Sequence, residues 1–358
     1  MAGSKSFLIC VYLRPKYYQV KYDTMILAGD VGGTKTRLAF CRLEDGRIIR
    51  QQTDTFLSRD YSCLEEVVQN FINKYGVSVD KSCFGVPGPV VNGEAKATKL
   101  PWHFKEEQIS KDLNIPTVRL VNDLVATAAA VPHLMPEDLY VLHEGEQPTD
   151  NGSGGSEERE SVIGVLAPGT GLGEAFVYTT AGQRCIMASE GGHTDFAPTN
   201  EDEVKLFQYL MSKHDHVSYD RVLSGPGLNS ICAFLKDTGF APEPPELEKR
   251  LREEDPGKVI TTTGKTGEYE LCVKTLDIFA SILGAQAGNM VLTLMATGGI
   301  YLGGGIPAGI YKKLAEGTTV NSYLNKGRLS YLVRNTPLYV ILDDHTALLG
   351  AAYIASES

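Results

Sequence analysis

The stretch Leu27–Phe40, LAGDVGGTKTRLAF, predicts a strand, a tight turn and a second strand, and the surrounding pattern extends this β-hairpin from Met25 to Leu43. The turn carries two glycines, Gly32 and Gly33, where most turns carry polar side chains. A carboxylate, Asp30, stands just before them. A turn without side chains lets a ligand approach the backbone amides closely.

The hairpin pattern occurs twice in the chain. ILAGDVGGTKTRLAF (26–40) and GVLAPGTGLGEAFVY (164–178) each contain an apolar strand, a glycine-rich turn and a strand of small and apolar residues. One copy opens each half of the chain, as expected for a repeated supersecondary unit. Two similar α/β units that face each other enclose a cleft, into which both turns would point. The 358 residues are enough for two such domains.

The two glycine turns could hold phosphate groups from opposite sides, because successive backbone amides form a concave anion site. Thr34, Lys35 and Thr170 would add further donors. If Mg²⁺ accompanies the phosphates, Asp30 is placed to hold the metal's water shell. Gly-Gly in one turn could simply make a tight hairpin. Two matched turns and a third glycine cluster at Thr297–Pro307 favour a nucleotide site instead.

A candidate general base lies at a junction of strand and helix. TVRLVNDLVATAAAV (117–131) passes from a predicted strand into an alanine-rich helix, with Asn122 and Asp123 at the change. Ligands of open α/β sheets collect at the carboxyl ends of strands. Asp123 could therefore take a proton from an attacking hydroxyl. It could also cap the helix, which is a common use of Asp in such a place, and the two roles are compatible.

Two further segments carry candidate sugar ligands. In MASEGGHTDFAP, Glu190 and His193 surround two glycines, and a loop there would hold an acceptor close to an imidazole, which suits neighbouring sugar hydroxyls. A surface histidine without function is the alternative. Asp220 and Arg221 precede another glycine turn, Ser224–Gly227. This pair could instead be a solvated ion pair.

Composition excludes several classes of protein. The net charge is −10 and no run of Lys or Arg offsets it, so nucleic acid is not a predicted partner. With 42% hydrophobic and 22% charged residues, the chain fits neither a disordered nor a membrane protein. Seven scattered cysteines without a Cys-x-x-Cys pair predict reduced thiols in a cytosolic protein.

The first 24 residues differ from the rest. Their apolar run, Phe7–Leu13, is too short to cross a bilayer and no small-x-small cleavage site follows it. Met25 directly precedes the first strand of the hairpin. We therefore expect residues 1–24 to be a loose extension or not native, and their deletion to leave activity intact.

Taken in order, the motifs resemble one family. Asp-x-Gly-Gly-Thr, Val-Asn-Asp, Ala-Pro-Gly-Thr-Gly-Leu-Gly, Glu-Gly-Gly-His-x-Asp-Phe-Ala-Pro and Leu-Ser-Gly-Pro-Gly-Leu resemble bacterial-type glucokinases of the hexokinase/actin-like superfamily, from about Met25 to Tyr353. A related group of sugar kinases carries a cysteine-rich zinc motif after its histidine. Here Thr-Asp-Phe follows the histidine, which favours the glucokinase branch.

The resemblance implies a role for individual positions, with Asp123 as the catalytic base. The implied ligands of the sugar hydroxyls are Asn122, Asp123, Glu190, His193 and Asp220. The implied nucleotide-binding residues are Gly29, Asp30, Val31, Gly32, Gly33 and Thr34 in the first turn, Gly169, Thr170 and Gly171 in the second turn at 169–173, and Gly304 in the segment 298–305 that faces the adenosine.

Two positions depart from the family pattern. Asp220 stands where the family has a glutamate, which is one methylene longer. Lys99 stands where similar sequences usually carry asparagine. Both changes bear on the selectivity for glucose more than on the reaction itself.

The resemblance implies an actin-like, ribonuclease-H-like duplicated α/β fold, with a small domain at 25–131 plus 344–358 and a large domain at 132–343. It implies a cytoplasmic enzyme of glycolysis that transfers phosphate from ATP, with Mg²⁺, to the 6-hydroxyl of D-glucose. No nucleic acid or membrane partner is implied, and a homodimer is compatible with the resemblance.

Three alternatives remain beside this interpretation. The substrate could be another hexose, such as mannose or glucosamine, and the phosphoryl donor could be polyphosphate. In a different class, the chain could be a non-catalytic sugar-sensing regulator on the same fold. Such regulators usually carry an N-terminal helix-turn-helix, for which residues 1–24 are too short and too β-like.

Overall fold

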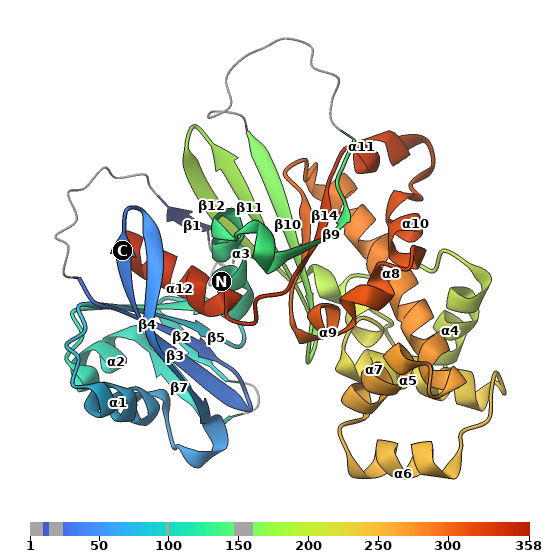
Figure 1. Ribbon diagram of the computed structural model, residues 1–358, viewed down its shortest axis with the longest axis horizontal. Helices are drawn as coiled ribbons and strands as arrows, with labels where there is room; N and C mark the ends of the chain where they lie inside the picture. The colour runs from blue at the N-terminus through green and yellow to red at the C-terminus, as the bar shows by residue number, and fades with distance from the viewer. Residues whose placement is uncertain (1–9, 14–23, 98–99, 147–159) are drawn as a thin grey trace, which may run out of the picture.

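The computed structural model describes residues 10–13, 24–97, 100–146 and 160–358, which form two main sheets with covering helices (Figure 1). The smaller main sheet has the strand order β4-β3-β2-β5-β8. Its strands are β2 (Ile26–Val31), β3 (Lys35–Glu44), β4 (Arg47–Leu57), β5 (Lys81–Val86) and β8 (Thr117–Asn122). The first three are antiparallel, whereas β5 and β8 run parallel to β2. The predicted hairpin is confirmed as β2 and β3.

The larger sheet has the order β1-β12-β11-β10-β13-β14-β9. Its strands are β1 (Cys10–Leu13), β9 (Leu139–His143), β10 (Ser161–Pro168), β11 (Leu172–Thr180), β12 (Gln183–Ser189), β13 (Ile300–Leu302) and β14 (Leu338–Ile341). Here β10, β11 and β12 are antiparallel, and β13 and β14 run parallel to β10. Both sheets therefore contain an antiparallel meander followed by two parallel strands. A two-stranded ribbon joins β6 (Glu94–Lys96) to β7 (His103–Lys105).

The helices lie in three layers around these sheets. Those packed on the smaller sheet or between the sheets are α1 (Leu64–Tyr75), α2 (Glu106–Leu113), α3 (Asp123–Ala130) and α12 (Thr346–Glu357). Those beyond the larger sheet are α4 (Glu201–Met211), α5 (Gly225–Asp237), α6 (Pro245–Glu253), α7 (Pro256–Thr266), α8 (Glu270–Leu294), α9 (Gly305–Leu314), α10 (Thr318–Leu324) and α11 (Ser330–Arg334). Short 3₁₀ turns are η1 (Ser58–Asp60), η2 (Val131–His133), η3 (Pro136–Asp138), η4 (Gly191–His193), η5 (Tyr219–Arg221) and η6 (Gly327–Leu329).

Alternation along the strands divides the buried residues among three cores. In β2, Leu27 faces a core shared with α1 and α2, whereas Ile26 and Ala28 face the layer of α3 and α12. That middle layer also receives Val165 and Ala175 from the larger sheet, so α3 and α12 are packed between the two sheets (Figure 1). The third core lies around α8 on the far side of the larger sheet. The middle layer is what joins the two hairpins.

Helix α8 is long and apolar enough to cross a membrane by composition alone, but 83% of its most apolar window is buried inside the protein. A helix that is hydrophobic on all sides and buried on all sides is a core helix. It forms the centre of the third core.

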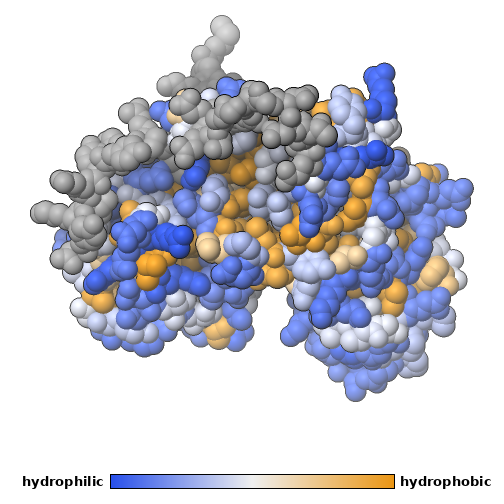
Figure 2. Space-filling model, turned by 45° about the horizontal axis from the view of Figure 1, so that its top comes forward, coloured by the Kyte–Doolittle hydropathy of each residue, from blue (hydrophilic) through white to orange (hydrophobic). Residues whose placement is uncertain are grey.

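On the surface drawn in Figure 2, a notch separates two masses of the molecule, and apolar residues line its inner end.

The predictions for residues 1–24, for Lys99 and for the cysteines have different outcomes. Within the predicted extension 1–24, residues 10–13 form β1, which pairs with β12 at the edge of the larger sheet. Lys99 lies outside the described residues. Cys41, Cys63, Cys83, Cys232 and Cys272 are free, as predicted. Cys185 is disulfide-bonded, so the expectation of reduced thiols is wrong at that position.

Candidate active site

The first glycine turn connects β2 to β3 and is anchored by a serine. The amide of Gly32 donates to the carbonyl of Lys35 at 2.9 Å, which closes the hairpin. Ser58 Oγ donates to the carbonyl of Gly32 at 2.8 Å, and Ser58 N donates to the carbonyl of Thr34 at 3.0 Å. The carbonyls of the turn are thus tied back to η1. Thr34 itself is exposed at the tip.

The second glycine turn connects β10 to β11 and is held mainly by neighbouring backbone. Gly169 N donates to the carbonyl of Gly171 at 2.8 Å, and Gly225 N at the start of α5 donates to the carbonyl of Gly169 at 2.8 Å. A Cβ atom on Gly171 would lie 2.7 Å from Asp220 Oδ1, and one on Gly173 would lie 2.9 Å from Leu124 Cδ2. A side chain at either position would therefore have to displace Asp220 or Leu124.

The third glycine cluster meets the second turn from the other side. Gly303 N donates to the carbonyl of Leu166 at 2.9 Å. Gly304 has a φ of +85°, and a Cβ atom there would lie 2.8 Å from the carbonyl oxygen of Pro168. Gly304 also immediately precedes α9. The structure thus brings Gly304 to the start of the turn that contains Gly169.

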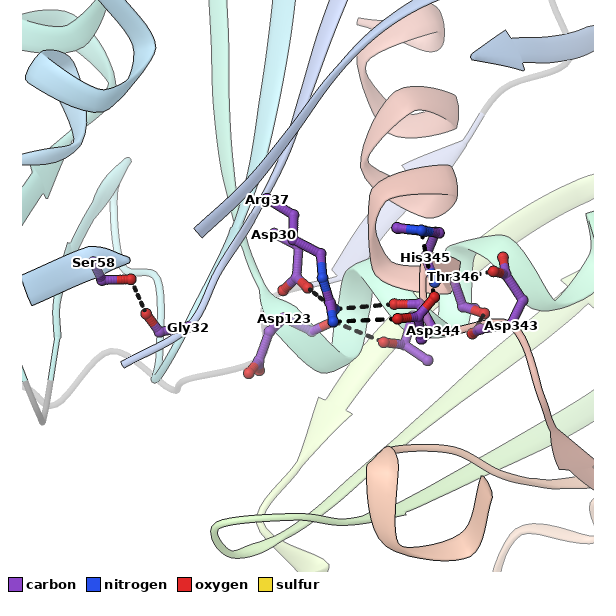
Figure 3. A network of polar contacts seen from close by, with 10 residues as sticks. Asp30, Gly32, Arg37, Ser58, Asp123, Asp343, Asp344, His345 and Thr346 are labelled. Carbon is purple, nitrogen blue, oxygen red and sulfur yellow. Dashed lines mark hydrogen bonds and ion pairs between the residues drawn. The ribbon is translucent and has the colours of Figure 1, made fainter. Parts of the chain in front are cut away.

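Asp123 stands where the first hairpin meets α3. Asp30 on β2 pairs with Gly85 on β5, and a Cβ atom on Gly85 would lie 3.4 Å from Asp123 Cα. Burial and, to a smaller extent, the charge of Asp30 together raise the pKa of Asp123 to about 6, against hydrogen bonds such as that from the amide of Leu124, which lower it. Figure 3 shows Asp30 and Asp123 beside each other. A carboxylate with a pKa near 6 is suited to accept a proton at neutral pH.

Helix capping is done by Asn122, not by Asp123. Asn122 Oδ1 accepts from the amides of Leu124 and Val125, at 3.0 and 3.4 Å. Asn122 Nδ2 donates to the carbonyl of Gly88 at 3.1 Å. Asp123 is the first helical residue, and its Oδ1 accepts from the amide of Leu124 at 2.9 Å. The capping alternative for Asp123 is therefore wrong, and its carboxylate keeps further acceptor capacity.

Arg37 is a residue of this site that sequence reasoning missed. Its guanidinium lies 3.4 Å from Asp30 Oδ2 and 3.3 Å from Asp344 Oδ2, and donates to the carbonyl of Asp344 at 3.1 Å (Figure 3). Burial raises the pKa of Asp30, and the charge of Arg37 opposes this shift. The hairpin register places Arg37 directly opposite Asp30. That pairing was the available signal, because residues opposite each other in a hairpin are neighbours.

Glu190 and His193 lie close together, as predicted. His193 Nε2 is 4.0 Å from Glu190 Oε2, and both side chains are exposed. A Cβ atom on Gly192 would collide with the carbonyl of Leu172, so η4 packs directly against the start of β11. Among the described residues no hydrogen bond or ion pair joins this pair to Asp123. The connection runs through β11 instead, whose Gly173 touches the helix that begins at Asp123.

Asp220 is engaged by the second turn. Its Oδ1 accepts from the amide of Leu172 at 2.7 Å, and the same oxygen is the one that a Cβ atom on Gly171 would meet. Asp220 therefore holds the second glycine turn in this structure, besides its implied role as a sugar ligand. The shorter side chain keeps the carboxylate close to its own backbone and to the turn.

The carboxylates of the site fit a magnesium ion only in an indirect mode. Within the described ranges, no group of three or more His, Cys, Asp or Glu side chains could hold a metal ion by itself. Mg²⁺ usually keeps several waters and takes one or two carboxylates together with substrate phosphates. Asp30, near the first turn and beside Asp123, fits that mode.

Comparison with known proteins agrees with this geometry. The family model described as Glucokinase matches residues 27–358. A glucokinase of Nostoc punctiforme is 36% identical over 348 residues, covering 93% of this chain and 99% of that relative. The crystal structure of a glucokinase from an Antarctic psychrotroph, 28% identical, superposes with a TM-score of 0.80 over 94% of this chain and 100% of that one.

A more distant solved structure shares the fold. It is a glucokinase of the ROK family from Streptomyces griseus in complex with glucose and AMPPNP, 17% identical, with a TM-score of 0.59 over 93% of this chain and 100% of that one. With a family model across nearly the whole described sequence and a relative above one-third identity at almost full length, the chain belongs to the glucokinase family.

Proposed function

We propose that the protein transfers the γ-phosphoryl group of ATP to the 6-hydroxyl of D-glucose, with Asp123 as the general base. The observation that carries the proposal is the position of Asp123. Its backbone lies against Gly85 beside Asp30, and the residue after it, Leu124, packs against Gly173 of the second turn. One carboxylate thus stands between two glycine turns that can each hold phosphates.

The proposed fold is the actin-like, ribonuclease-H-like duplicated core with a central cleft. Its support is the common strand order of the two sheets, each an antiparallel meander followed by two parallel strands. The proposed small domain is 25–131 plus 344–358, and the large domain is 132–343. The notch visible in Figure 2 is the place we assign to the cleft.

ATP would lie across the two turns. The proposed contacts come from Gly29 to Thr34 on one side, and from Gly169, Thr170 and Gly171 with Gly304 on the other. Thr34 and Thr170 are exposed at the tips of their turns, where their hydroxyls are free to donate to phosphate oxygens. When bound, Mg²⁺ would neutralise phosphate charge, with Asp30 holding its water shell.

The sugar would lie near η4 and the start of α3. Glu190 and His193 offer an acceptor and an imidazole 4.0 Å apart on an exposed loop, which suits adjacent hydroxyls. Asp220 and Asn122 complete the proposed set, although both already bind backbone amides through their oxygens. These two residues then act by holding the turn and the helix start in place, with their remaining lone pairs and N–H available to glucose.

The pKa of Asp123 suits it to accept the proton of the attacking hydroxyl at neutral pH. The attacking hydroxyl gives its proton to the carboxylate while its oxygen bonds to the γ-phosphorus and the bond to the ADP oxygen breaks. A pKa of about 6 leaves the carboxylate mostly ionised at pH 7 and still able to hold the proton it receives. Most of the rate would come from positioning and charge stabilisation.

The cellular setting belongs to the same proposal. We place the enzyme in the cytoplasm, at the entry of glucose into glycolysis. The free thiols of Cys41, Cys83, Cys232 and Cys272, all buried, are compatible with a reducing compartment, whereas the disulfide-bonded Cys185 is not typical of one. All residues of the proposed site belong to one chain. The proposal is therefore compatible with a monomer and with a homodimer.

The test measures formation of the sugar phosphate by the purified chain, because transfer from polyphosphate releases no ADP. Glucose, mannose, glucosamine, fructose and galactose are compared as acceptors, each with ATP and with polyphosphate as donor. We expect the highest kcat/KM with glucose and ATP, and a loss of turnover when EDTA removes divalent metal. A chain that binds glucose but phosphorylates no hexose with either donor would support the regulator instead. Preference for another hexose would point to Asp220 as the cause.

A further inference from the structure

A buried glutamate lies directly beneath the loop that carries Glu190 and His193. Glu174 is on β11 and is only 6% exposed. Its Oε1 accepts from Gln286 Nε2 on α8 at 2.9 Å. Its Oε2 occupies the place that a Cβ atom on Gly191 would need, so the carboxylate packs directly against the backbone of η4.

The contact continues through α8 to the second proposed sugar segment. Gln286 Oε1 accepts from Asn289 Nδ2 at 3.1 Å, and Asn289 Nδ2 also donates to Tyr219 Oη at 3.0 Å. Tyr219 is 3% exposed and directly precedes Asp220 in η5. The chain of four polar side chains therefore starts under η4 and ends in η5.

The two segments are also joined to each other. The amide of Tyr219 donates to the carbonyl of Thr194, the residue after His193, at 3.1 Å. Lys326 Nζ donates to Asn289 Oδ1 at 2.8 Å and to the carbonyl of Ala285 at 2.8 Å, which fixes the side chain of Asn289 from behind. Buried networks in which each member depends on the next hold their ends at a defined separation.

A second buried glutamate shows what an ordinary structural role looks like. Glu203 accepts from the amide and hydroxyl of Thr199, from Asn200 Nδ2 and from Ser281 Oγ, at 2.6 to 2.9 Å. Its carboxylate is thus satisfied on both oxygens. Glu174 accepts one side-chain hydrogen bond within the described part of the chain. A buried carboxylate with so few donors is costly for stability and calls for an explanation beyond packing.

The space behind η4 makes the position of the loop sensitive to this network. A cavity of about 200 Å³ is lined by Glu174, Gln286, Gly191 and Thr194, together with apolar groups of α8 such as Met290. Without the carboxylate beneath it, the loop could settle into this volume. Such a movement would carry Glu190 and His193 away from the positions they hold here.

We propose that Glu174, Gln286, Asn289 and Tyr219 are positioning residues that hold η4 and η5 at the separation a hexose requires, and so determine affinity and selectivity for the sugar. The inference rests on the proposed function, because it assigns η4 and η5 to the sugar. None of the four residues is required to touch the reacting atoms. Their loss should therefore affect the KM for the sugar more than kcat or the KM for ATP.

The main experiment exchanges donor and acceptor between two of these residues. Gln286→Glu places two carboxylates against each other, and we expect the KM for glucose to rise about tenfold or more, since one tenfold step needs only about 1.4 kcal/mol. Glu174→Gln keeps an acceptor for Gln286, so its KM should change about twofold at most. The double variant E174Q/Q286E restores one donor facing one acceptor and should return towards the wild-type KM.

A second variant covers the case in which Gln286→Glu does not fold. Asn289→Asp removes the donor to Tyr219 but keeps the acceptor for Lys326, so the helix retains its contact. We expect an increased KM for glucose and more even rates across hexoses, with kcat and the KM for ATP within about twofold. Thermal unfolding, with and without glucose, measures folding and sugar binding without turnover.

The outcomes separate the two proposals. If the wild-type chain phosphorylates no hexose, the proposed function is wrong. If it does, but the KM for glucose is unchanged in folded Q286E and N289D, the positioning network is wrong. A parallel loss of kcat and of affinity for both substrates, without recovery in the double variant, would also overturn it, because that is the result of general destabilisation.

Discussion

The two glycine hairpins have the same order of elements, yet different forces keep their turns bare. In the first hairpin, a Cβ atom on Gly32 would meet only the carbonyl of Lys35, at 2.9 Å, and the turn is anchored by Ser58. In the second, Gly171 and Gly173 face side chains from other segments, Asp220 and Leu124. The first turn is therefore held by Ser58, which directly follows β4 of the same sheet. The second turn is held by segments of both proposed domains.

This difference indicates which turn can transmit a change in the rest of the molecule. The second turn touches the helix that begins at Asp123, the start of α5 through Gly225, and the cluster containing Gly304. A substitution there should disturb several proposed binding groups together. The first turn itself is anchored to η1 by Ser58, and Arg37 of the adjoining β3 contacts Asp344, so a disturbance of this turn should stay local.

Substitution of Asp123, which lies between the two turns, should have the largest effect on turnover. Asp123→Asn keeps size and shape but removes the base, and we expect kcat to fall by about 10²-fold or more. Glucose should still bind, as measured by equilibrium dialysis with labelled sugar. Turnover within about threefold of the wild type would remove Asp123 from the proposed mechanism and leave only the phosphate-binding part of the comparison.

The same variant has an expected effect on stability, with a defined sign. The pKa of Asp123 is raised in the folded chain, from 3.8 to about 6, so its contribution to stability is complete below pH 3.8 and is lost as the pH rises through 6. Asp123→Asn removes this loss. Urea unfolding should therefore show D123N to be more stable than the wild type at pH 8. This advantage should disappear at pH 4.

A side chain in the second turn should have the next largest effect. Gly171→Val must displace Asp220, and overpacking of this kind costs about 1–3 kcal/mol. The KM for ATP should rise about tenfold or more, in the assay with saturating glucose. Gly169→Ala is the matched control, because the nearest atom to its Cβ is 4.0 Å away. G169A should unfold like the wild type while still raising the KM for ATP.

The control sharpens the comparison between protein packing and ligand access. If G169A leaves both stability and the KM for ATP unchanged, the bareness of this turn serves packing alone. An unchanged nucleotide dependence in both variants would contradict the phosphate site at the second turn.

The smallest effect is expected at Arg37 of the first hairpin. Arg37→Gln removes the ion pairs with Asp30 and Asp344. The Arg37 side chain that makes both pairs is 26% exposed. The free energy of unfolding should fall by about 1–3 kcal/mol, as for the loss of charge-assisted hydrogen bonds. Asp344→Asn is the control, because the Asp344 side chain is 69% exposed and surface pairs contribute about 0–1 kcal/mol. Equal losses in both variants would contradict a special role for the pair with Asp30.

Much of the local structure was predictable because its signals are local. Period-two alternation and glycine turns located both hairpins, and the strand-to-helix change located Asp123. The capping assignment failed at Asp123 because adjacent Asn and Asp are both good caps. Which one turns its oxygen towards the free amides depends on backbone angles at the end of β8. Asn122 has the extended backbone of a cap residue, with φ of −62° and ψ of 143°.

The network from Glu174 to Tyr219 could not be predicted from the sequence. Glu174 reads as one polar residue in a strand, and Gln286 and Asn289 read as polar interruptions of an apolar helix. Their separations along the chain, 112 residues between Glu174 and Gln286 and 70 between Asn289 and Tyr219, leave no local pattern. Only the packing of β11 against α8 makes them neighbours.

The sequence by itself determined the two bare turns, the carboxylate at the strand end and the family, because propensities and motifs depend on residues close together in the chain. The tertiary structure decided that burial, together with the charge of Asp30, raises the pKa of Asp123, that Asp220 holds the second turn, and that Arg37 reaches Asp344. The physical reason is that burial and charge–charge interactions depend on distances in space. Those distances exist only after the helices between the sheets have brought the two hairpins together.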